Sequence, residues 1–383
     1  MNIKEKNRVG IITDVYNKKK KGGISWYTGR LVEAIKTFSL QDMEIVLIHA
    51  EKNDDEVHSG FKKIIYPSIK IKESIYLPKV RSCKKIFKDN NIKVLHFPSF
   101  RLVNWPFFKI EDIKFILTIH DLARCISKLR KPIIISKNLR QIFYNFYHFL
   151  EDKTLNSVKN RVDRFIAVSY NTKKDMIKLL GIPEHKINVV YEAADKIFKI
   201  ECCSEKTPDW LNRFCPYILT PSLSLMVIEV YHQLLKKGIK HKLLVFNKPA
   251  FLPLLKDKGL EEEIIFLEYI SLNQLAELYR WADLLIYYNK YEGFGLIPIE
   301  AMASGCPVIS SCVGSLPEII GNGGILLNNN EKEEWIKRAY EILISRLVRE
   351  KLIATGLIQS QRFSWGKTAE ETLRIYREML TKN

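Results

Sequence analysis

Residues Ala282–Glu318, ADLLIYYNKYEGFGLIPIEAMASGCPVISSCVGSLPE, have a pattern of apolar runs and glycines that indicates the fold class. The apolar run Leu284–Tyr288 is typical of a buried strand, and it ends in the turn Gly293–Gly295, whose two glycines let backbone approach a ligand closely. A helix then runs to about Ser304 and stops before the next apolar run, Pro307–Ser310. Strand, loop, helix and strand in this order predict a parallel sheet.

The turn at Gly293–Gly295 also has features of a ligand site. A helix N-terminus presents unpaired N–H groups and a partial positive charge, so this turn is suited to holding a phosphate. Glu292 lies in the turn, and Glu300 lies about one turn into the helix, where the tilt of side chains toward the N-terminus brings its carboxylate back to the same place. Carboxylates accept hydrogen bonds from hydroxyl groups, which sugars and ribose supply.

Glu292, seven intervening residues, Glu300 and the following AMASGCPV resemble the signature of family 4 retaining glycosyltransferases, which have the GT-B fold and transfer sugars from nucleotide donors. The resemblance implies that Glu292 contacts the donor hexose as a catalytic residue, and that Glu300 holds the ribose hydroxyls. It also implies a donor-binding turn over Phe294, Gly295 and Leu296, with backbone N–H groups on the diphosphate. The alternative is an ordinary strand-to-helix connection with two solvated glutamates.

Alternating apolar and helical stretches predict an α/β protein with two domains. The strands expected in the first domain are Val9–Thr13, Glu44–His49, Val94–Phe97, Phe115–Ile119 and Phe165–Val168, and the resemblance implies a last strand at Ile187–Tyr191. Those expected in the second are Tyr217–Leu219, Leu243–Phe246, Ile264–Leu267, Leu284–Tyr288 and Val308–Ser310. The resemblance implies GT-B architecture, two Rossmann-like domains facing across a cleft that holds the ligand at the carboxyl ends of both sheets.

The expected domain boundaries follow from where the periodicity is lost, around residues 195–215. We expect residues 1–198 to form an acceptor-side domain and residues 199–215 to form a linker. Residues 216–363 should form the nucleotide-sugar-binding domain, and residues 364–383 resemble the family's closing helix, which crosses back to the first domain.

Strand ends in the first domain supply further candidates. Gly22 and Gly23 follow the first strand and resemble the family's glycine-rich loop, whose backbone reaches the donor phosphates or the acceptor, although such turns also occur in plain loops. His120 ends the run Leu117–Ile119 and resembles the family's histidine that meets the donor sugar, so we expect it to be catalytic. His96 shares this position, with a core role or an acceptor-side role as alternatives.

The sequence departs from the family pattern after the first strand of the second domain. The family continues there with a glycine and a basic pair that grips the donor diphosphate, whereas this chain has no Lys or Arg between Tyr217 and Lys236. Lys248, at the end of the next strand, is a candidate replacement cation, and a lysine beside Gly22 and Gly23 is another. Three functions stay open: a hexosyltransferase, a degenerate relative that binds a sugar or a partner without turnover, and, with weaker support, a nucleotide-sugar epimerase.

Length and composition fit a large enzyme. The chain has 383 residues, 46% of them hydrophobic, which is enough for two full cores. It has no secretory signal and no run of ~18 apolar residues, so we expect no membrane span. Its seven cysteines include no C-x-x-C pair, which argues against a disulfide framework or zinc site and favours the cytoplasm. No metal and no cofactor are expected.

Positive charge is concentrated in the first half of the chain. Residues 1–200 contain 39 Lys and Arg against 21 Asp and Glu, whereas residues 201–383 contain 22 of each, so the whole formal charge of +18 lies in the first half. Solvated helix faces are one explanation. The other is attraction to an anionic membrane surface, at the inner face of the membrane, with Trp105–Phe108 as apolar anchors. No recognised nucleic-acid-binding motif is present, so nucleic acid is not an expected partner.

The expected partners are a nucleotide sugar and a glycan or lipid-linked acceptor of surface polysaccharide synthesis. By likeness to a subfamily of mannosyltransferases we favour GDP-mannose as the donor, with a UDP-sugar as the alternative.

Overall fold

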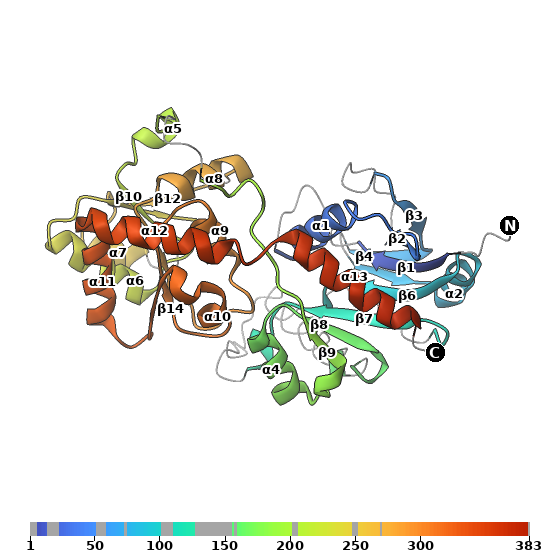
Figure 1. Cartoon of the computed structure of the whole chain (residues 1–383). Helices are drawn as coiled ribbons and strands as arrows, with labels where there is room; N and C mark the ends of the chain where they lie inside the picture. Colours follow the sequence, from blue (N-terminus) through green and yellow to red (C-terminus); the bar gives the residue numbers. More distant parts are fainter. Residues whose placement is uncertain are drawn as a thin grey trace. The chain divides into compact units, whose positions relative to one another are not determined.

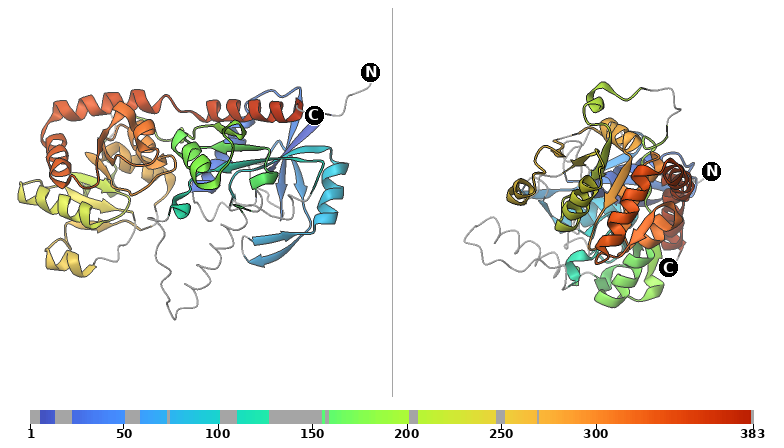
Figure 2. Two further views of the ribbon diagram at one scale, coloured as in Figure 1. Left: turned by 90° about the horizontal axis from the view of Figure 1, so that it is seen from below. Right: turned by 90° about the vertical axis from the view of Figure 1, so that its left-hand side faces the viewer.

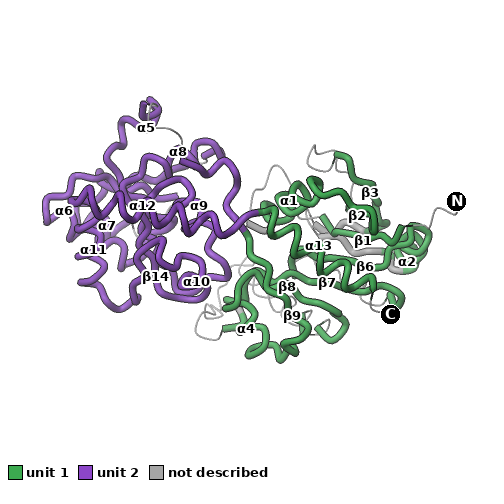
Figure 3. Tube along the Cα trace, in the orientation of Figure 1, with its two compact units in different colours: residues 1–192, 365–383 green, residues 193–364 purple. Residues whose placement is uncertain are grey.

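The computed structural model describes residues 6–13, 23–50, 59–72, 75–100, 110–126, 155–156, 159–200, 206–246, 252–268 and 270–381. The chain forms two compact units, residues 1–192 with 365–383 (unit 1) and residues 193–364 (unit 2) (Figure 3). Each unit is a parallel sheet covered by helices (Figure 1). Gly22, Lys248 and the Trp105–Phe108 segment lie outside the described residues.

The described strands of unit 1 form a seven-stranded parallel sheet in the order β3-β2-β1-β6-β7-β8-β9. Their bounds are β1 Asn7–Ile12, β2 Met43–His49, β3 Lys62–Ile65, β6 Ile92–Phe97, β7 Lys114–Ile119, β8 Arg164–Ala167 and β9 Ile187–Val189. Two further strands, β4 Ser68–Lys72 and β5 Ile75–Pro78, pair with each other as a separate antiparallel sheet (Figure 2).

Helices cover both faces of this sheet, and the strand side chains alternate between them. The helices are α1 Gly23–Ile35, α2 Val80–Asp89, α4 Tyr170–Leu180 and α13 Trp365–Thr381. On β6, Val94 belongs to the core that includes α1 and α13, and its neighbour Leu95 belongs to the core that includes α2 and α4. Burial on both faces explains why the central strands of this sheet are mostly apolar.

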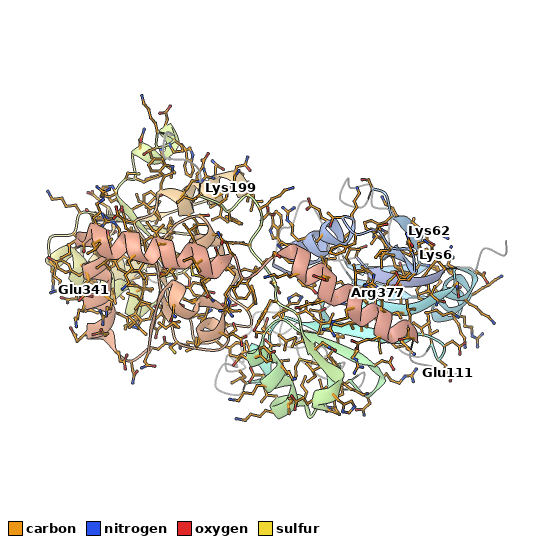
Figure 4. All side chains as sticks on the ribbon, in the orientation of Figure 1. Lys6, Lys62, Glu111, Lys199, Glu341 and Arg377 are labelled. Carbon is orange, nitrogen blue, oxygen red and sulfur yellow. The ribbon has the colours of Figure 1, made fainter. Side chains whose placement is uncertain are left out.

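Helix α13 completes unit 1 although it follows the whole of unit 2 in sequence. It packs beside α1 on one face of the sheet, with Leu373 and Tyr376 fully buried (Figures 1 and 2). The Thr368 hydroxyl donates to the carbonyl oxygen of Tyr191 at 2.7 Å. On the outside of the helix, Arg377 pairs with Asp42 at 2.8 Å (Figure 4).

Unit 2 is a six-stranded parallel sheet in the order β12-β11-β10-β13-β14-β15. The strands are β10 Tyr217–Thr220, β11 Lys242–Val245, β12 Ile264–Phe266, β13 Leu284–Tyr287, β14 Val308–Ser311 and β15 Ile325–Leu327. The strand order reverses between β10 and β13, and ligands of such sheets bind outside the carboxyl ends of the strands at this point. A ligand site is therefore expected at the loops after β10 and β13.

The helices of unit 2 are α5 Asp209–Asn212, α6 Leu225–Lys236, α7 Leu252–Asp257, α8 Leu272–Trp281, α9 Leu296–Ala303, α10 Leu316–Ile320, α11 Lys332–Ile344 and α12 Arg346–Ser360. Serine side chains start three of them: the hydroxyls of Ser224, Ser271 and Ser345 accept from the N–H three residues later in α6, α8 and α12. Helix α9 is different, because it begins at Gly295 with no side-chain cap.

The boundary between the units differs from the expected one. Unit 1 ends at Glu192 instead of 198, because Phe198 already packs edge-on against Tyr279 of α8 at 5.7 Å between ring centres. The expected linker, 199–215, lies in unit 2 and contains α5. Strands β3 and β15 and the β4–β5 pair were not among the expected strands.

Candidate functional site

The turn between β13 and α9 is shaped by glycine. Gly295 has a φ of +116°, which side-chain-bearing residues rarely adopt, and a Cβ there would lie 3.1 Å from Leu316 Cδ2. No side chain caps the start of α9, and the N–H groups of a helix start without such a cap are suited to hold an anion. Phe294 precedes this glycine and packs edge-on against Phe363, and Leu296 is the first residue of α9; their role in donor binding stays a prediction.

The turn at Gly314 and Ser315, after β14, holds the backbone of Glu292 in place. Gly314 has a φ of +56°, and a Cβ there would lie 2.3 Å from the carbonyl oxygen of Glu292. The next residue, Ser315, donates its N–H to that same oxygen at 3.1 Å and its hydroxyl to the carbonyl oxygen of Phe294 at 2.6 Å. The loop that carries Glu292 is therefore held in one place by the segment after β14.

The Glu292 carboxylate is held by two neutral donors. The hydroxyl of Tyr287 donates to Oε2, and the side-chain amide of Asn289 donates to the same oxygen at 2.9 Å. Burial, followed by the charge of Glu292, raises the pKa of Tyr287 well above its ordinary value, so this hydroxyl keeps its proton and donates it to the carboxylate.

Glu300 lies one turn into α9, and its carboxylate faces the hydroxyl of Tyr279 on α8. Burial first, then the charge of Glu300, raises the pKa of Tyr279 well above its ordinary value. The charge of Glu300 also acts on Tyr287, the partner of Glu292. Glu292 thus lies just before the start of α9 and Glu300 one turn into it, and the predicted contacts with hexose and ribose stay predictions.

The β10–α6 loop has no cationic group at its start. Ser224 accepts from the N–H of Val227 at 3.2 Å and so occupies the first turn of α6, and the Thr220 hydroxyl donates to the carbonyl oxygen of Ser222 at 3.1 Å. Serine and threonine take the place where the family pattern has a glycine and two cations. The predicted replacement, Lys248, lies outside the described residues.

In unit 1, His120 follows β7 and has an acceptor at each ring nitrogen. Nδ1 lies 2.7 Å from Glu192 Oε1, and Nε2 lies 2.7 Å from the carbonyl oxygen of Pro98. Burial lowers the pKa of His120, but the hydrogen bond and charge of Glu192, helped by Pro98 and Asp121, raise it overall. Both nitrogens donate only in the imidazolium, so a ring nitrogen reaches a sugar only by giving up a partner.

Glu192 is a residue that sequence reasoning missed. It is 3% exposed and is paired with a histidine 72 residues earlier in the chain. The signal in the sequence for this pairing was the position of Glu192 shortly after β9. Strands β7 and β9 end at the same edge of the sheet, so residues after them lie at that edge. Gly23 is the first residue of α1, at the same edge after β1.

His96 is a core residue. It is fully buried, with Nδ1 2.6 Å from the Tyr376 hydroxyl and Nε2 2.8 Å from Thr118 Oγ1. Burial, and then the charge of His120, lowers the pKa of His96 to about 3, so its ring is neutral. Of its two alternatives, the acceptor-side role is not supported by this geometry.

The described part of the chain contains neither a membrane-spanning helix nor a cluster of metal ligands. None of the helices there has the length and apolar character needed to cross a membrane. No group of three or more His, Cys, Asp or Glu side chains there is arranged to hold a metal ion.

Comparison with known proteins places both units. Residues 225–357 match the model for "Glycosyl transferases group 1", and residues 21–196 match the model for "Glycosyltransferase Family 4". The second match covers the His120 strand end in unit 1, and the first covers Glu292, Glu300 and the start of α9 in unit 2.

Individual relatives are more distant. A D-inositol 3-phosphate glycosyltransferase from Nocardioides is 30% identical over 52% of this chain and 43% of its own length. The O-antigen chain mannosyltransferase B of Escherichia coli is 25% identical over 59% of this chain and 63% of its own length. The matched part of this chain therefore spans less than two thirds of either relative.

Among solved structures, sucrose-phosphate synthase from Thermosynechococcus elongatus matches 98% of this chain and 99% of its own, with a TM-score of 0.74 at 17% identity. This likeness shows the fold: two Rossmann-like parallel-sheet domains of the GT-B type. The two family models, which between them match parts of both units, show that the chain belongs to the group 1 glycosyltransferases of family 4.

Proposed function

We propose that this protein is a retaining hexosyltransferase that moves a hexose from a nucleotide sugar to a glycan or lipid-linked acceptor in surface polysaccharide synthesis. One observation carries the proposal: Glu292 lies just before the uncapped start of α9 and Glu300 one turn into it, after the strand at which the order of the sheet reverses. The start of α9 suits the diphosphate of a nucleotide sugar, and the two carboxylates suit the hydroxyls of its ribose and its hexose.

The chemistry assigns a role to each part of this site. The N–H groups at the start of α9 receive the diphosphate and stabilise the charge that develops on it as the sugar leaves. Glu300 accepts from the ribose hydroxyls, and Glu292 accepts from the hydroxyls of the hexose. The acceptor attacks from the face that the diphosphate leaves, which retains the anomeric configuration. The residues named here need no metal for these steps.

Mannose from GDP-mannose is the donor we favour, and a UDP-sugar is the alternative. The support for mannose is the likeness to the O-antigen chain mannosyltransferase B, at 25% identity. Discrimination between guanine and uracil is a property of base contacts, so calorimetry with GDP and UDP separates the two donors before any transfer is measured.

A second candidate function is a sugar-binding subunit without turnover. The observation that favours it is the β10–α6 loop, where no Lys or Arg occurs between Tyr217 and Lys236 and Ser224 closes the helix start. If the enzyme is active, another cation must offset the diphosphate charge, and Lys248 is the residue we propose.

One experiment separates these functions. The full chain is incubated with a panel of GDP- and UDP-sugars, with and without a lipid-linked glycan acceptor, and release of nucleoside diphosphate is measured. Transfer that depends on the acceptor, and that falls in Lys248→Ala, supports the transferase. Release without an acceptor indicates hydrolysis, and interconversion of the sugar indicates an epimerase. Binding without turnover of any donor supports the sugar-binding subunit.

We propose that the protein works in the cytoplasm, at the inner face of the membrane. The support is the positive charge of the first half of the chain, which includes the exposed Lys62 and Lys63 on β3 (Figure 4). Binding to such a surface falls as salt screens the charges. Sedimentation with vesicles rich in acidic lipid, at low and high salt, tests this, and absence of binding at low salt contradicts it.

A further inference from the structure

Asn289 lies between the end of β13 and the loop that carries Glu292, and all its polar groups are engaged. Its N–H donates to Ser311 Oγ at 2.9 Å, and its carbonyl oxygen accepts from the side-chain amide of Asn329 at 2.8 Å. Its Oδ1 accepts from the N–H of Lys290 at 2.9 Å, and its Nδ2 donates to Glu292 Oε2 at 2.9 Å.

These partners determine the orientation of the Asn289 amide. The Lys290 N–H can only donate and an ionised carboxylate can only accept, so the amide oxygen must face Lys290 and the amide nitrogen must face Glu292. The backbone of Asn289 is meanwhile held by Ser311, the last residue of β14, and by Asn329, which follows β15. Three strand ends therefore fix one donor, and that donor fixes one carboxylate oxygen.

Tyr287 supplies the second donor to this oxygen. It is the last residue of β13 and is 6% exposed. Its hydroxyl donates to Glu292 Oε2 and keeps its proton because its pKa lies well above the ordinary value. Tyr288, the next residue, packs its ring edge-on against Trp335 at 5.7 Å, so adjacent tyrosines have different surroundings.

We propose that Asn289 and Tyr287 are positioning residues, which hold the Glu292 carboxylate in the orientation that accepts the hydroxyls of the donor hexose. This inference rests on the proposed function, and it names the residues that orient the sugar-binding carboxylate of Glu292. Both donors are neutral, so they orient the carboxylate without cancelling the charge that the sugar hydroxyls recognise. An acceptor already fixed in place loses less conformational freedom when the sugar binds.

The test compares affinity for a nucleotide sugar with affinity for the bare nucleoside diphosphate. Calorimetry on the full chain measures both GDP-mannose and GDP, or UDP-glucose and UDP if uridine binds better, and their ratio isolates the sugar's contribution. In Asn289→Ala and Tyr287→Phe we expect this ratio to fall about tenfold, with affinity for the diphosphate within about twofold of wild type. Tyr288→Phe is the matched control and should keep the wild-type ratio.

Asn289→Asp gives a signature that a purely structural role does not. It keeps the size of the side chain and the acceptor for Lys290, but it places a second carboxylate against Glu292, so at about pH 7.5 the two repel and preference for the sugar is lost. At about pH 5.5 the pair can share one proton, which restores a donor to Glu292. Tyr287 stays protonated across this range, and the charge of Glu300, which acts on Tyr287, is common to wild type and variant.

The outcomes separate this inference from the function on which it rests. If wild type binds nucleotide sugar no better than nucleoside diphosphate, the sugar assignment of Glu292 fails and the inference fails with it. If wild type prefers the sugar and the Asn289 and Tyr287 variants do so equally, the inference alone is overturned. Recovery of the ratio in Asn289→Asp at the lower pH supports it, and an unchanged wild-type ratio in that variant at both pH values overturns it.

Discussion

Two carboxylates lie at the carboxyl ends of parallel strands, Glu192 in unit 1 and Glu292 in unit 2, and their partners differ. Glu292 receives hydrogen bonds from a hydroxyl and an amide, both neutral. Glu192 is paired with His120, whose pKa is raised. Neutral donors orient a carboxylate and leave its charge available, whereas an imidazolium neutralises the charge and makes the pair sensitive to pH. Glu292 is thus suited to receive a ligand, and Glu192 to hold a histidine in place.

The largest effect is expected where the backbone behind Glu292 is disturbed. Gly314→Ala places a Cβ 2.3 Å from the Glu292 carbonyl oxygen at a φ of +56°, so the loop must move. We expect the free energy of unfolding to fall by about 3–5 kcal/mol, together with loss of donor binding. Gly259→Ala is the control, because its φ is +65° but nothing lies within 4 Å of the added Cβ. Its cost should be about 1–2 kcal/mol with donor binding kept. Equal effects in both variants would show that only the backbone angle matters.

Removing the charge at Glu292, and separately at Glu192, should show which of the two carboxylates acts in sugar transfer. We expect Glu292→Gln to lower the rate of sugar transfer by about 100-fold or more, because an acceptor aligned with the hexose is lost, while nucleoside diphosphate affinity stays near wild type. Steady-state kinetics and calorimetry measure the two quantities. Glu192→Gln should leave more activity than Glu292→Gln. The reverse order would mean that the catalytic carboxylate lies in unit 1.

Glu300 should act on the nucleotide end of the donor. Loss of its hydrogen bonds with ribose in Glu300→Ala is expected to cost about 1.5–3 kcal/mol of binding free energy for the nucleoside diphosphate. Calorimetry at one salt concentration measures this, with Glu333→Ala of α11, whose side chain is largely exposed, as the surface control. Unchanged affinity in Glu300→Ala would rule out the ribose assignment.

The smallest effect is a change with pH that belongs to unit 1. The pKa of His120 is raised in the folded state, so its pairing with Glu192 stabilises the fold fully below the unfolded value of about 6.5, and this contribution is lost as pH rises through the folded pKa. Urea unfolding across that window should show stability falling in wild type and a flatter profile in Glu192→Gln. Glu184→Gln, which removes an exposed partner of Lys173, is the control and should keep the wild-type slope.

Much of unit 2's site could be predicted because its signals are local. The turn at Gly295, the helix after it and the strand at Val308–Ser311 follow one another within about thirty residues, and each has its own residue preference. The positions of Glu292 and Glu300 beside the helix start follow from that geometry. Their partners Tyr279 and Tyr287 did not, because a tyrosine in an apolar segment is usually a core residue and its hydroxyl partner depends on packing.

Contacts between distant segments explain what could not be predicted. The pairing of His120 with Glu192 joins β7 to the segment after β9, and nothing local to either residue indicates it. Strand β3 escaped notice because its lysines are typical of a solvated face, although lysines are also common on strands at a sheet edge. The boundary at Glu192 depends on the contact of Phe198 with Tyr279, which is tertiary.

The contribution of α13 to unit 1 has a consequence for synthesis of the chain. Leu373 and Tyr376 are part of the core that contains α1 and β1, so that core is incomplete until residues beyond 364 have left the ribosome. Unit 2 is complete in sequence at that point. Domains that are synthesised first usually fold first. Here unit 1 begins the chain but cannot complete its core until unit 2 has been synthesised. Its apolar sheet face, with Val9 and Ile11, stays without its final cover for most of translation, and chaperones would meet the nascent protein there.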